Sequence, residues 1–408
     1  MAEAAFGLNG EPARSKRRVA FLVQRIGPYH HARLARLAAS QSWCVTAVEF
    51  RPADSVYAWA DVPADGAYER RQTRSARELR AALEQVGPEA VVCVGYSDPE
   101  IHQAMTWAVR RGLPLVTCSD STYEDESRSW VKETSKRLVV APFAAALVAG
   151  SRAHAYLGRL GISRDRRFEP WDVVDNLHFE RGAEASRGEA DAMRARYRLP
   201  PRYFLCVARF VPKKNLRRLI EAYAGYAAMA GSAAWSLVLS GDGPEEARLR
   251  ADVAALKLEA QVHFPGFLQY SDLPAAYGLA GAFVLPSISD QWGLVVNEAM
   301  AAGLPVLVSA RCGCAPELVR EGENGFTFDP ENTGQLAGLM AELAGRDEAQ
   351  RAAMGRRSRE IVSAFSPETF ARGLEAALAR ACGFPRTRTS FLTRLSIHLL
   401  AGRSPHPA

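Results

Sequence analysis

Short apolar runs typical of buried β-strands recur along this chain, and each is followed by a loop and by apolar residues at helical spacing. The stretch "RRVAFLVQRIGPYHHARLARLAAS", which starts at Arg17, contains all three parts. The same order continues through "WCVTAVEF", "SARELRAALEQVG", "EAVVCVGY", "SDPEIHQAMTWAVRRG" and "LPLVTCSD". Apolar strands that alternate with helices are typical of parallel sheets covered on both faces. We therefore expect a doubly wound α/β fold.

The chain is long enough for two such units. Its 408 residues exceed what one hydrophobic core usually supports. The alternation stops over 164–201, which is rich in charged residues, and restarts at Tyr203 with "YFLCVARF". It then runs through "NLRRLIEAYAGYAAM", "WSLVLSGDGP", "EEARLRADVAALKL", "QVHFPGF", "SDLPAAYGLA", "GAFVLPS", "LVVNEAMAAG", "LPVLVS" and "GFTFDP". The predicted organisation is a flexible N-terminus at 1–16, a Rossmann-like domain at 17–180, a linker at 181–200 and a second Rossmann-like domain at 201–365.

Charge and cysteine usage argue against several classes of protein. The net charge is +6 and the pI about 9.0, but the basic residues form no stripe interleaved with aromatics, so we expect no nucleic-acid partner. The seven cysteines are scattered and several lie in apolar runs, which predicts reduced thiols and no metal site. No signal-peptide core precedes Lys16, and no apolar run is long enough to span a bilayer. We expect a cytoplasmic protein.

The loop after the first strand of the second domain carries two cations. Arg209 and Lys214 lie in "ARFVPKKN", where a strand ends and a helix is expected to begin. Backbone N–H groups and the helix dipole favour an anion at such a place. Arg and Lys there would form a phosphate or diphosphate clamp. The alternative is two exposed charges at a helix entry.

The next strand ends in a glycine turn, "LSGDGPEEARLR". Gly241 and Gly243 allow a tight turn and a close approach of the backbone to a ligand. The dinucleotide fingerprint fails at Glu246, so the alternative is a plain strand-to-helix turn.

A carboxylate stands in the apolar helix predicted from "LVVNEAMAAG". Glu298 would be buried there, and an unpaired buried carboxylate costs several kcal/mol. The two hydroxyls of a ribose could satisfy it, since a carboxylate only accepts hydrogen bonds. Asp290 lies eight positions earlier, near the N–H groups of Gly293 and Leu294. The alternative is a capping Asp and a Glu paired with an internal Arg.

Taken in order, these blocks resemble the retaining glycosyltransferases of family 4, which have the GT-B fold of two Rossmann-like domains facing each other across a cleft. The resemblance covers most of the chain and is densest between Tyr203 and Pro330. It is carried by "ARFVPKKNLRRLIEAY", "LSGDGPEEARLR", "VHFPGFLQYSDLPAAY", "VLPSISDQWGLVVNEAMAAGLPVLVS" and "GCAPELVREGENGFTFDP". The family pairs two glutamates eight positions apart, whereas this chain has Asp290 at the first position, which bears on the identity of the sugar.

The resemblance implies a role for each motif residue. Arg209 and Lys214 would bind the diphosphate of a nucleotide sugar, Asp290 the sugar, and Glu298 the ribose. Backbone groups of the donor site would come from Gly27, Gly241, Gly243, Gly293, Leu294 and Val295. The acceptor side would include Tyr29, His30, His31 and Asp120. The helix at 366–382 would cross back to the first domain.

The predicted function is transfer of a sugar from a nucleotide-diphosphate donor to an acceptor hydroxyl with retention of configuration, in polysaccharide, glycolipid or glycoconjugate biosynthesis. Fixed cations can stabilise the leaving diphosphate, so neither metal nor other cofactor is expected. The alternatives are a nucleotide-sugar epimerase of the same fold and a non-catalytic nucleotide-sugar-binding subunit.

The tail at 383–408 has apolar residues at helical spacing among arginines, in "FPRTRTSFLTRLSIHLLAGR". A basic amphipathic helix of this kind lies on an anionic membrane surface in some proteins, which would suit a lipid-linked acceptor. Alternatively, it packs back on the protein.

Overall fold

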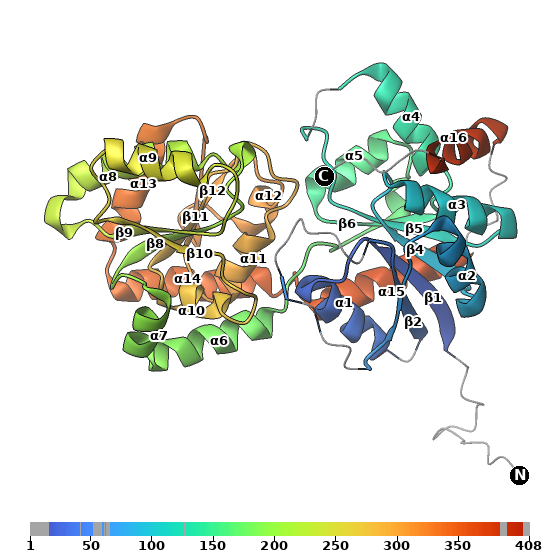
Figure 1. The fold of residues 1–408 in the computed structure, drawn as a ribbon, viewed down its shortest axis with the longest axis horizontal. Helices are drawn as coiled ribbons and strands as arrows, with labels where there is room; N and C mark the ends of the chain where they lie inside the picture. The colour runs from blue at the N-terminus through green and yellow to red at the C-terminus, as the bar shows by residue number, and fades with distance from the viewer. Residues whose placement is uncertain are drawn as a thin grey trace, which may run out of the picture.

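A computed structural model of the chain describes residues 16–40, 42–51, 59–60, 62, 66–125, 128–383 and 390–402. These residues form two α/β domains side by side, each built around one parallel sheet (Figure 1). The expected pair of doubly wound domains is confirmed. Of the predicted N-terminus and tail, 1–15, 384–389 and 403–408 lie outside the described residues.

The first domain has a sheet of seven strands in the order β3-β2-β1-β4-β5-β6-β7. Its register is parallel throughout; Val19, for example, pairs with Val45 on one side and with Ala90 on the other. The strands are β1 (Arg17–Val23), β2 (Trp43–Glu49), β3 (Glu69–Gln72), β4 (Ala90–Val94), β5 (Leu115–Ser119), β6 (Ala145–Val148) and β7 (Arg167–Phe168). The helices are α1 (Pro28–Ala38), α2 (Ala76–Val86), α3 (Pro99–Arg111), α4 (Trp130–Val140) and α5 (Ser151–Arg159).

The second domain has six strands in the order β10-β9-β8-β11-β12-β13. They are β8 (Tyr203–Val207), β9 (Ser236–Ser240), β10 (Val262–Gly266), β11 (Ala282–Leu285), β12 (Val306–Ser309) and β13 (Gly325–Phe328). The helices are α8 (Leu216–Ala230), α9 (Glu246–Ala255), α10 (Leu273–Leu279), α11 (Leu294–Ala301), α12 (Ala315–Leu318), α13 (Thr333–Gly345) and α14 (Glu348–Val362). In both sheets the strand order reverses beside the first strand of the domain, and such a reversal opens a crevice at the carboxyl ends of the strands.

The predicted linker at 181–200 is wrong. That segment belongs to two helices, α6 (Asn176–Gly188) and α7 (Ala190–Tyr197), which pack against α10; α6 also packs against α11. The packing is close: a Cβ on Gly278 of α10 would lie 2.7 Å from the carbonyl oxygen of Ala183. The chain therefore passes between the domains ahead of α6, just after β7.

The last helices return to the first domain. Helix α15 (Pro367–Gly383) packs against α1 and against β5, β6 and β7, and Arg380 pairs with Asp165 at 2.6 Å. Helix α16 (Phe391–Ala401) packs on α3 and α4 through the buried side chains of Thr393 and Ile397. This part of the tail thus packs back on the protein, and its contact with a membrane stays a prediction. Among the described residues, no helix is both long and apolar enough to cross a bilayer.

Candidate functional site

A cavity of about 680 Å³ lies between the two domains. Loops that follow β1, β4 and β5 line it from the first domain, and loops that follow β8, β9 and β11 line it from the second. It therefore occupies the place where doubly wound sheets bind ligands. Eleven of the sequence-predicted residues line it: Gly27, Tyr29, His30, Asp120, Arg209, Lys214, Gly241, Asp290, Gly293, Leu294 and Val295.

The two predicted cations lie on the second-domain side of this cavity. Lys214 ends a short 3₁₀ turn, Pro212–Lys214, ahead of α8. Asn215 follows in the left-handed conformation, and its amide donates to the carbonyl oxygens of Pro286 and Pro330 at 3.1 and 2.8 Å. Because both acceptors are buried loop carbonyls, this turn is held against the ends of β11 and β13.

Lys214 and Asp290 form an ion pair in this structure. The Nζ of Lys214 donates to Oδ2 of Asp290 at 2.5 Å, and each side chain is 14% exposed. The hydroxyl of Ser287 donates to the same oxygen at 3.3 Å. The backbone of Asp290 is fixed as well, since its carbonyl oxygen accepts from the N–H of Gly313. A phosphate entering the cavity would therefore have to share Lys214 with Asp290.

Glu298 is fully buried in α11, as predicted, but protein groups satisfy it. The hydroxyl of Tyr29 donates to Oε1 at 2.5 Å, and the hydroxyl of Tyr277 donates to Oε2 at 2.6 Å. The alternative of an internal Arg is wrong, since two tyrosines satisfy Glu298, whereas its contact with a ribose stays a prediction. Burial raises the pKa of Glu298 to about 7, although the two hydrogen bonds oppose the rise. Glu298 is not among the residues that line the cavity.

Gly241 and Gly243 are required because the loop after β9 packs closely on the loop after β8. A Cβ on Gly241 would lie 1.9 Å from the carbonyl oxygen of Ala208, and one on Gly243 would lie 2.6 Å from that of Phe210. Both have φ near +140°, at 139° and 146°, where residues with side chains are strained. Gly243 does not line the cavity, so a donor contact from this residue is not supported by its position. Gly293, with φ of 101°, precedes α11 and does line it.

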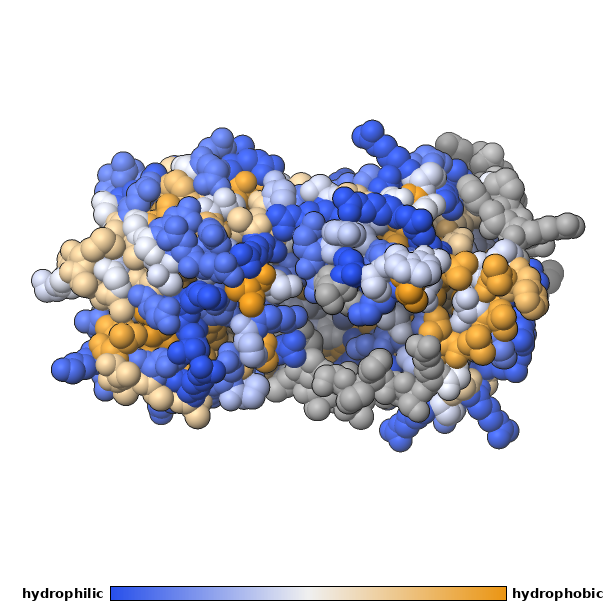
Figure 2. Space-filling view, turned by 90° about the horizontal axis from the view of Figure 1, so that it is seen from above, coloured by the Kyte–Doolittle hydropathy of each residue, from blue (hydrophilic) through white to orange (hydrophobic). Residues whose placement is uncertain are grey.

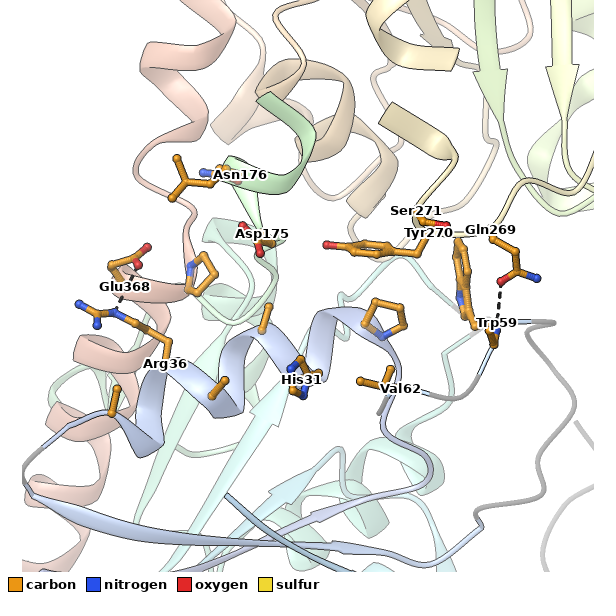
Figure 3. A pocket seen from close by; sticks show the side chains of 17 residues that line it. His31, Arg36, Trp59, Val62, Asp175, Asn176, Gln269, Tyr270, Ser271 and Glu368 are labelled. Atoms are coloured by element: carbon orange, nitrogen blue, oxygen red, sulfur yellow. Dashed lines mark hydrogen bonds and ion pairs between the residues drawn. The ribbon is translucent and has the colours of Figure 1, made fainter. Parts of the chain in front are cut away.

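The N-terminus of α1 presents its predicted residues to two different cavities. His30 lines the cavity between the domains, and burial together with Arg33 lowers its pKa to about 3. His31 contacts the hydroxyl of Tyr68 and lines a second cavity of about 750 Å³, which lies along α1 (Figure 3). His31 therefore lines a different cavity from His30, and its role on the acceptor side stays a prediction. At Gly27 a Cβ would meet no atom within 4 Å, so the glycine leaves open space there.

Sequence reasoning missed a buried charged cluster on the first-domain side. Arg33 donates to the carbonyl oxygen of Val173, stacks on Trp171 at 4.4 Å, and lies 3.5 Å from Oδ1 of Asp172. The other oxygen of Asp172 accepts no hydrogen bond from the described residues. Burial and Asp120 raise the pKa of Asp172 to about 8, and burial raises that of Asp120 to about 6. The available signal was a charged residue inside the apolar run "WDVV".

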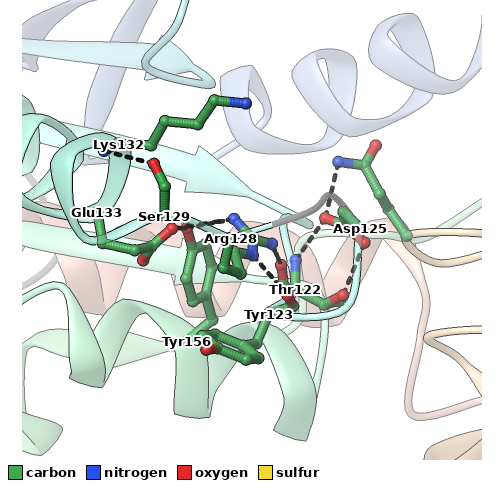
Figure 4. Close-up of polar contacts among 9 residues, drawn as sticks. Thr122, Tyr123, Asp125, Arg128, Ser129, Lys132, Glu133 and Tyr156 are labelled. Carbon is green, nitrogen blue, oxygen red and sulfur yellow. Dashed lines mark hydrogen bonds and ion pairs between the residues drawn. The ribbon is translucent and has the colours of Figure 1, made fainter.

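Loops of the two domains also touch beside the cavity. The Nε2 of Gln291 donates to Oδ2 of Asp125 at 3.2 Å, and the same carboxylate accepts from the backbone N–H and the hydroxyl of Thr122 (Figure 4). The loop after β5 is therefore tied both to itself and to the loop after β11. Together, the arrangement offers cations for an anionic group on one side and carboxyl groups for hydroxyls on the other.

Residues 190–361 match the family described as glycosyl transferases group 1. A relative from Mycobacterium tuberculosis, named GDP-mannose-dependent alpha-(1-6)-phosphatidylinositol monomannoside mannosyltransferase, is 34% identical over 199 residues, which are 47% of this chain and 50% of the relative. An O-antigen chain mannosyltransferase B from Escherichia coli is 31% identical over 38% of this chain and 40% of its own length. The chain thus spans about half the length, or less, of the curated relatives it matches.

Solved structures agree over nearly the whole chain. The structure of HepE from Anabaena in complex with UDP and glucose has a TM-score of 0.68 at 17% identity, and covers 89% of this chain and 99% of its own. A glycosyltransferase from Rickettsia africae has a TM-score of 0.70 at 14% identity, over 91% of this chain and 100% of its own. At these identities the likeness shows the fold, which is GT-B. Over most of its second domain, the chain is similar to the glycosyl transferases group 1 family.

Proposed function

We propose that the protein is a retaining, family 4 glycosyltransferase that moves a sugar from a nucleotide-diphosphate donor to an acceptor hydroxyl. The observation that carries the proposal is the cavity between the domains. It brings Arg209, Lys214 and the N-terminus of α11 to face Asp120 and Asp172 of the first domain. Named relatives support it: one is a GDP-mannose-dependent mannosyltransferase, and a structural neighbour is described with UDP and glucose bound.

The chemistry assigns a task to each side of the cavity. The bond between the anomeric carbon and the diphosphate oxygen breaks, and a bond from that carbon to the acceptor oxygen forms on the same face of the sugar. The proton of the acceptor hydroxyl leaves with the departing diphosphate. Negative charge develops on the departing diphosphate, where Arg209 and Lys214 stabilise it as fixed cations. Asp290 accepts hydrogen bonds from sugar hydroxyls once Lys214 turns to the phosphate. Glu298 accepts from the ribose after Tyr29 withdraws.

The donor is identified by a thermal-shift screen of UDP-, GDP- and dTDP-sugars against the full chain. A ligand at about a hundred times its dissociation constant stabilises the folded protein by about 2.7 kcal/mol. Lys214→Ala is expected to abolish most of the shift and most of the turnover while staying folded. The matched control is Arg248→Ala, an exposed cation of the same domain that does not line the cavity. Equal shifts in the two variants would place the phosphate elsewhere.

We also propose that the reaction needs no metal ion, because two cations already face the diphosphate position. Activity is expected to persist in excess chelator. Loss of activity that added Mg²⁺ restores would overturn this part of the proposal and leave the transfer itself standing.

A nucleotide-sugar epimerase of the same fold is the alternative activity, and a non-catalytic nucleotide-sugar-binding subunit is the other. Incubation with donor alone separates the two enzymes: a changed sugar on the nucleotide indicates the epimerase, whereas nucleotide release that depends on acceptor indicates the transferase. Binding without turnover across a broad acceptor panel indicates the subunit.

The proposal also includes the acceptor and the cellular location of the protein. We propose a cytoplasmic protein acting at the inner face of a membrane in polysaccharide, glycolipid or glycoconjugate biosynthesis, on an acceptor that is lipid-linked. The support is that the mycobacterial relative is named for a phosphatidylinositol monomannoside substrate, and that the first domain exposes apolar side chains.

A further inference from the structure

The first domain carries an apolar face that its own packing leaves uncovered. Of the ten large hydrophobic side chains that are exposed in the described part of the chain, six lie on α16 and on the first turn of α4. They range from 41% exposed at Leu395 to 80% at Trp130, and the set is Trp130, Val131, Phe391, Leu392, Leu395 and Leu399. Figure 2 shows an apolar patch over the end of the molecule where Figure 1 places α16. We call these six residues the apolar face.

Helix α16 is docked on the first domain by the side opposite this face. Thr393 and Ile397 are its buried residues, and the helix contacts α3 and α4. Ser390 caps its N-terminus, and the side chain of Gln103 on α3 donates to the carbonyl oxygen of Ala401 at 3.1 Å. A surface helix normally turns polar residues outward. Here four of the six exposed residues of α16 are apolar, so another surface is expected to cover them.

Hydrogen bonds of Arg128 hold the start of α4, and with it Trp130 and Val131, in place. The guanidinium of Arg128 donates to Oε1 of Glu133 at 3.2 Å and to the hydroxyl of Tyr156 at 2.8 Å, while Ser129 caps α4 (Figure 4). Trp130 is therefore presented at the start of a fixed helix. Glu133, the acidic residue of that first turn, is neutralised by Arg128 and points inward.

Basic side chains border the apolar face. Arg110 of α3 and Arg394 of α16 line a groove of about 230 Å³ together with Phe391 and Leu395. Lys132 is exposed on α4, and no acidic residue occurs in the sequence after Glu375. Tryptophan and leucine among cations are the composition of surfaces that bind anionic bilayers. Two copies of this face would bring like charges together, which disfavours self-association.

We infer that the apolar face inserts into the headgroup region of an anionic phospholipid bilayer and thereby fixes the first domain on the membrane surface. This inference identifies the surface that would bind the membrane in the location proposed above. It rests on the proposed function only for the biological role of membrane binding, since vesicle binding needs no turnover. The observations that carry it are the clustering of exposed apolar side chains, their rigid support, and the positive charge around them.

The test is co-sedimentation of the full chain with vesicles of phosphatidylcholine alone and of phosphatidylcholine with phosphatidylglycerol. The wild type is expected to pellet with the anionic vesicles only. Leu392→Glu with Leu399→Glu is expected to weaken the binding by about tenfold or more, because two inserted side chains become charged. The matched control is Met229→Glu with Leu256→Glu, which changes two exposed apolar residues on the second domain.

Three outcomes overturn the inference: equal pelleting of the two double variants, binding to the neutral vesicles that matches binding to the anionic ones, or no vesicle binding by the wild type. Light scattering that shows a dimer lost only in the Leu392→Glu, Leu399→Glu variant would assign the face to a second copy. The nucleotide-sugar thermal shift should be unchanged in both double variants, so a failure here is separate from a failure of the proposed transfer.

Discussion

At the scale of single residues, Glu298 illustrates how burial and function constrain the same carboxyl group. Two tyrosine hydroxyls satisfy its oxygens, one from each domain. Its pKa is nevertheless raised to about 7, because loss of hydration outweighs two hydrogen bonds. The folded protein therefore binds a proton at this site over a pH range in which the unfolded chain does not.

This difference predicts a pH dependence. The folded pKa lies above the ordinary value of 4.5, so stability falls as pH rises from about 4.5 to about 7. The contribution is on the order of 3 kcal/mol for a fully buried group. Glu298→Gln is expected to flatten that part of the profile, measured as urea unfolding followed by tryptophan fluorescence at several pH values. Asp120 and Asp172 titrate in both proteins and cancel in the comparison, so parallel profiles would contradict the assignment.

Asp172 predicts a second pH effect, over a wider range. Burial and the neighbouring Asp120 raise its pKa from 3.8 to about 8, so its contribution to stability declines as pH rises between those values. Asp172→Asn should therefore gain stability relative to the wild type from pH 4 to pH 8. Asp165→Asn is the control, because that exposed carboxylate has a pKa lowered to about 2 and stays ionised throughout this range. If the difference in stability from the wild type changed with pH in the same way for both variants, the raised pKa of Asp172 would be contradicted.

At the scale of elements, the packing of α6 on α10 attaches α6 to the second domain, although α6 precedes every strand of that domain's sheet. Gly278 of α10 lies against the backbone of Ala183, and Gly182 of α6 lies against Pro274. Close contacts of this kind require residues without a side chain, so the two helices are held at one spacing.

Gly278→Ala is expected to destabilise the protein by about 1–3 kcal/mol, because the new methyl group would lie within 3 Å of backbone atoms that cannot move independently. Gly338→Ala is the matched control. It is a helical glycine of α13 where a Cβ meets nothing within 4 Å, so that variant should be unchanged or more stable by up to about 1 kcal/mol. The measurement is thermal unfolding of both variants. Equal destabilisation of the two would mean that α6 and α10 separate easily.

Periodicity predicted most of the buried strands, but not the fully buried β6, and it missed elements with little buried surface. The apolar runs marked β1, β2, β4 and β5 and every strand of the second domain, whereas β3 reads "ERRQ" and gives no strand signal. The linker prediction failed because α6 and α7 are rich in charged residues; α6 buries only Phe179, Ala183 and Ser186, and α7 buries no residue. At the site, strand ends located the second-domain residues, but the tyrosines beside Glu298 are 21 and 269 positions away in the chain. Only the fold brings them together.

At the scale of the whole molecule, the two domains meet across the proposed donor site. Besides Tyr29 and Glu298, Arg152 of α5 donates to the carbonyl oxygen of Ala310 at 2.8 Å, and the N–H of Ser151 donates to Glu317 at the same distance. Aromatic side chains also meet across the domains: the ring centroids of Tyr29 and Tyr270 lie 5.8 Å apart, and those of Trp59 and Phe267 lie 5.0 Å apart. A ligand that reaches Glu298 must first separate Tyr29 from it.

Tyr29→Phe should therefore bind the nucleotide diphosphate more tightly than the wild type does. Without the phenol, no protein group competes with the ribose for Oε1 of Glu298. One hydrogen bond of about 1 kcal/mol corresponds to roughly fivefold in the dissociation constant.

Tyr277→Phe is the control, because it removes the hydroxyl that donates to Oε2 of Glu298 within the second domain. This variant should destabilise the protein without tightening binding, because Tyr277 does not line the cavity. Isothermal titration with the nucleotide from the screen measures both. If Tyr29→Phe binds more weakly than the wild type, the tyrosine contacts the nucleotide directly, and the hydrogen bond between the domains is no barrier to its entry.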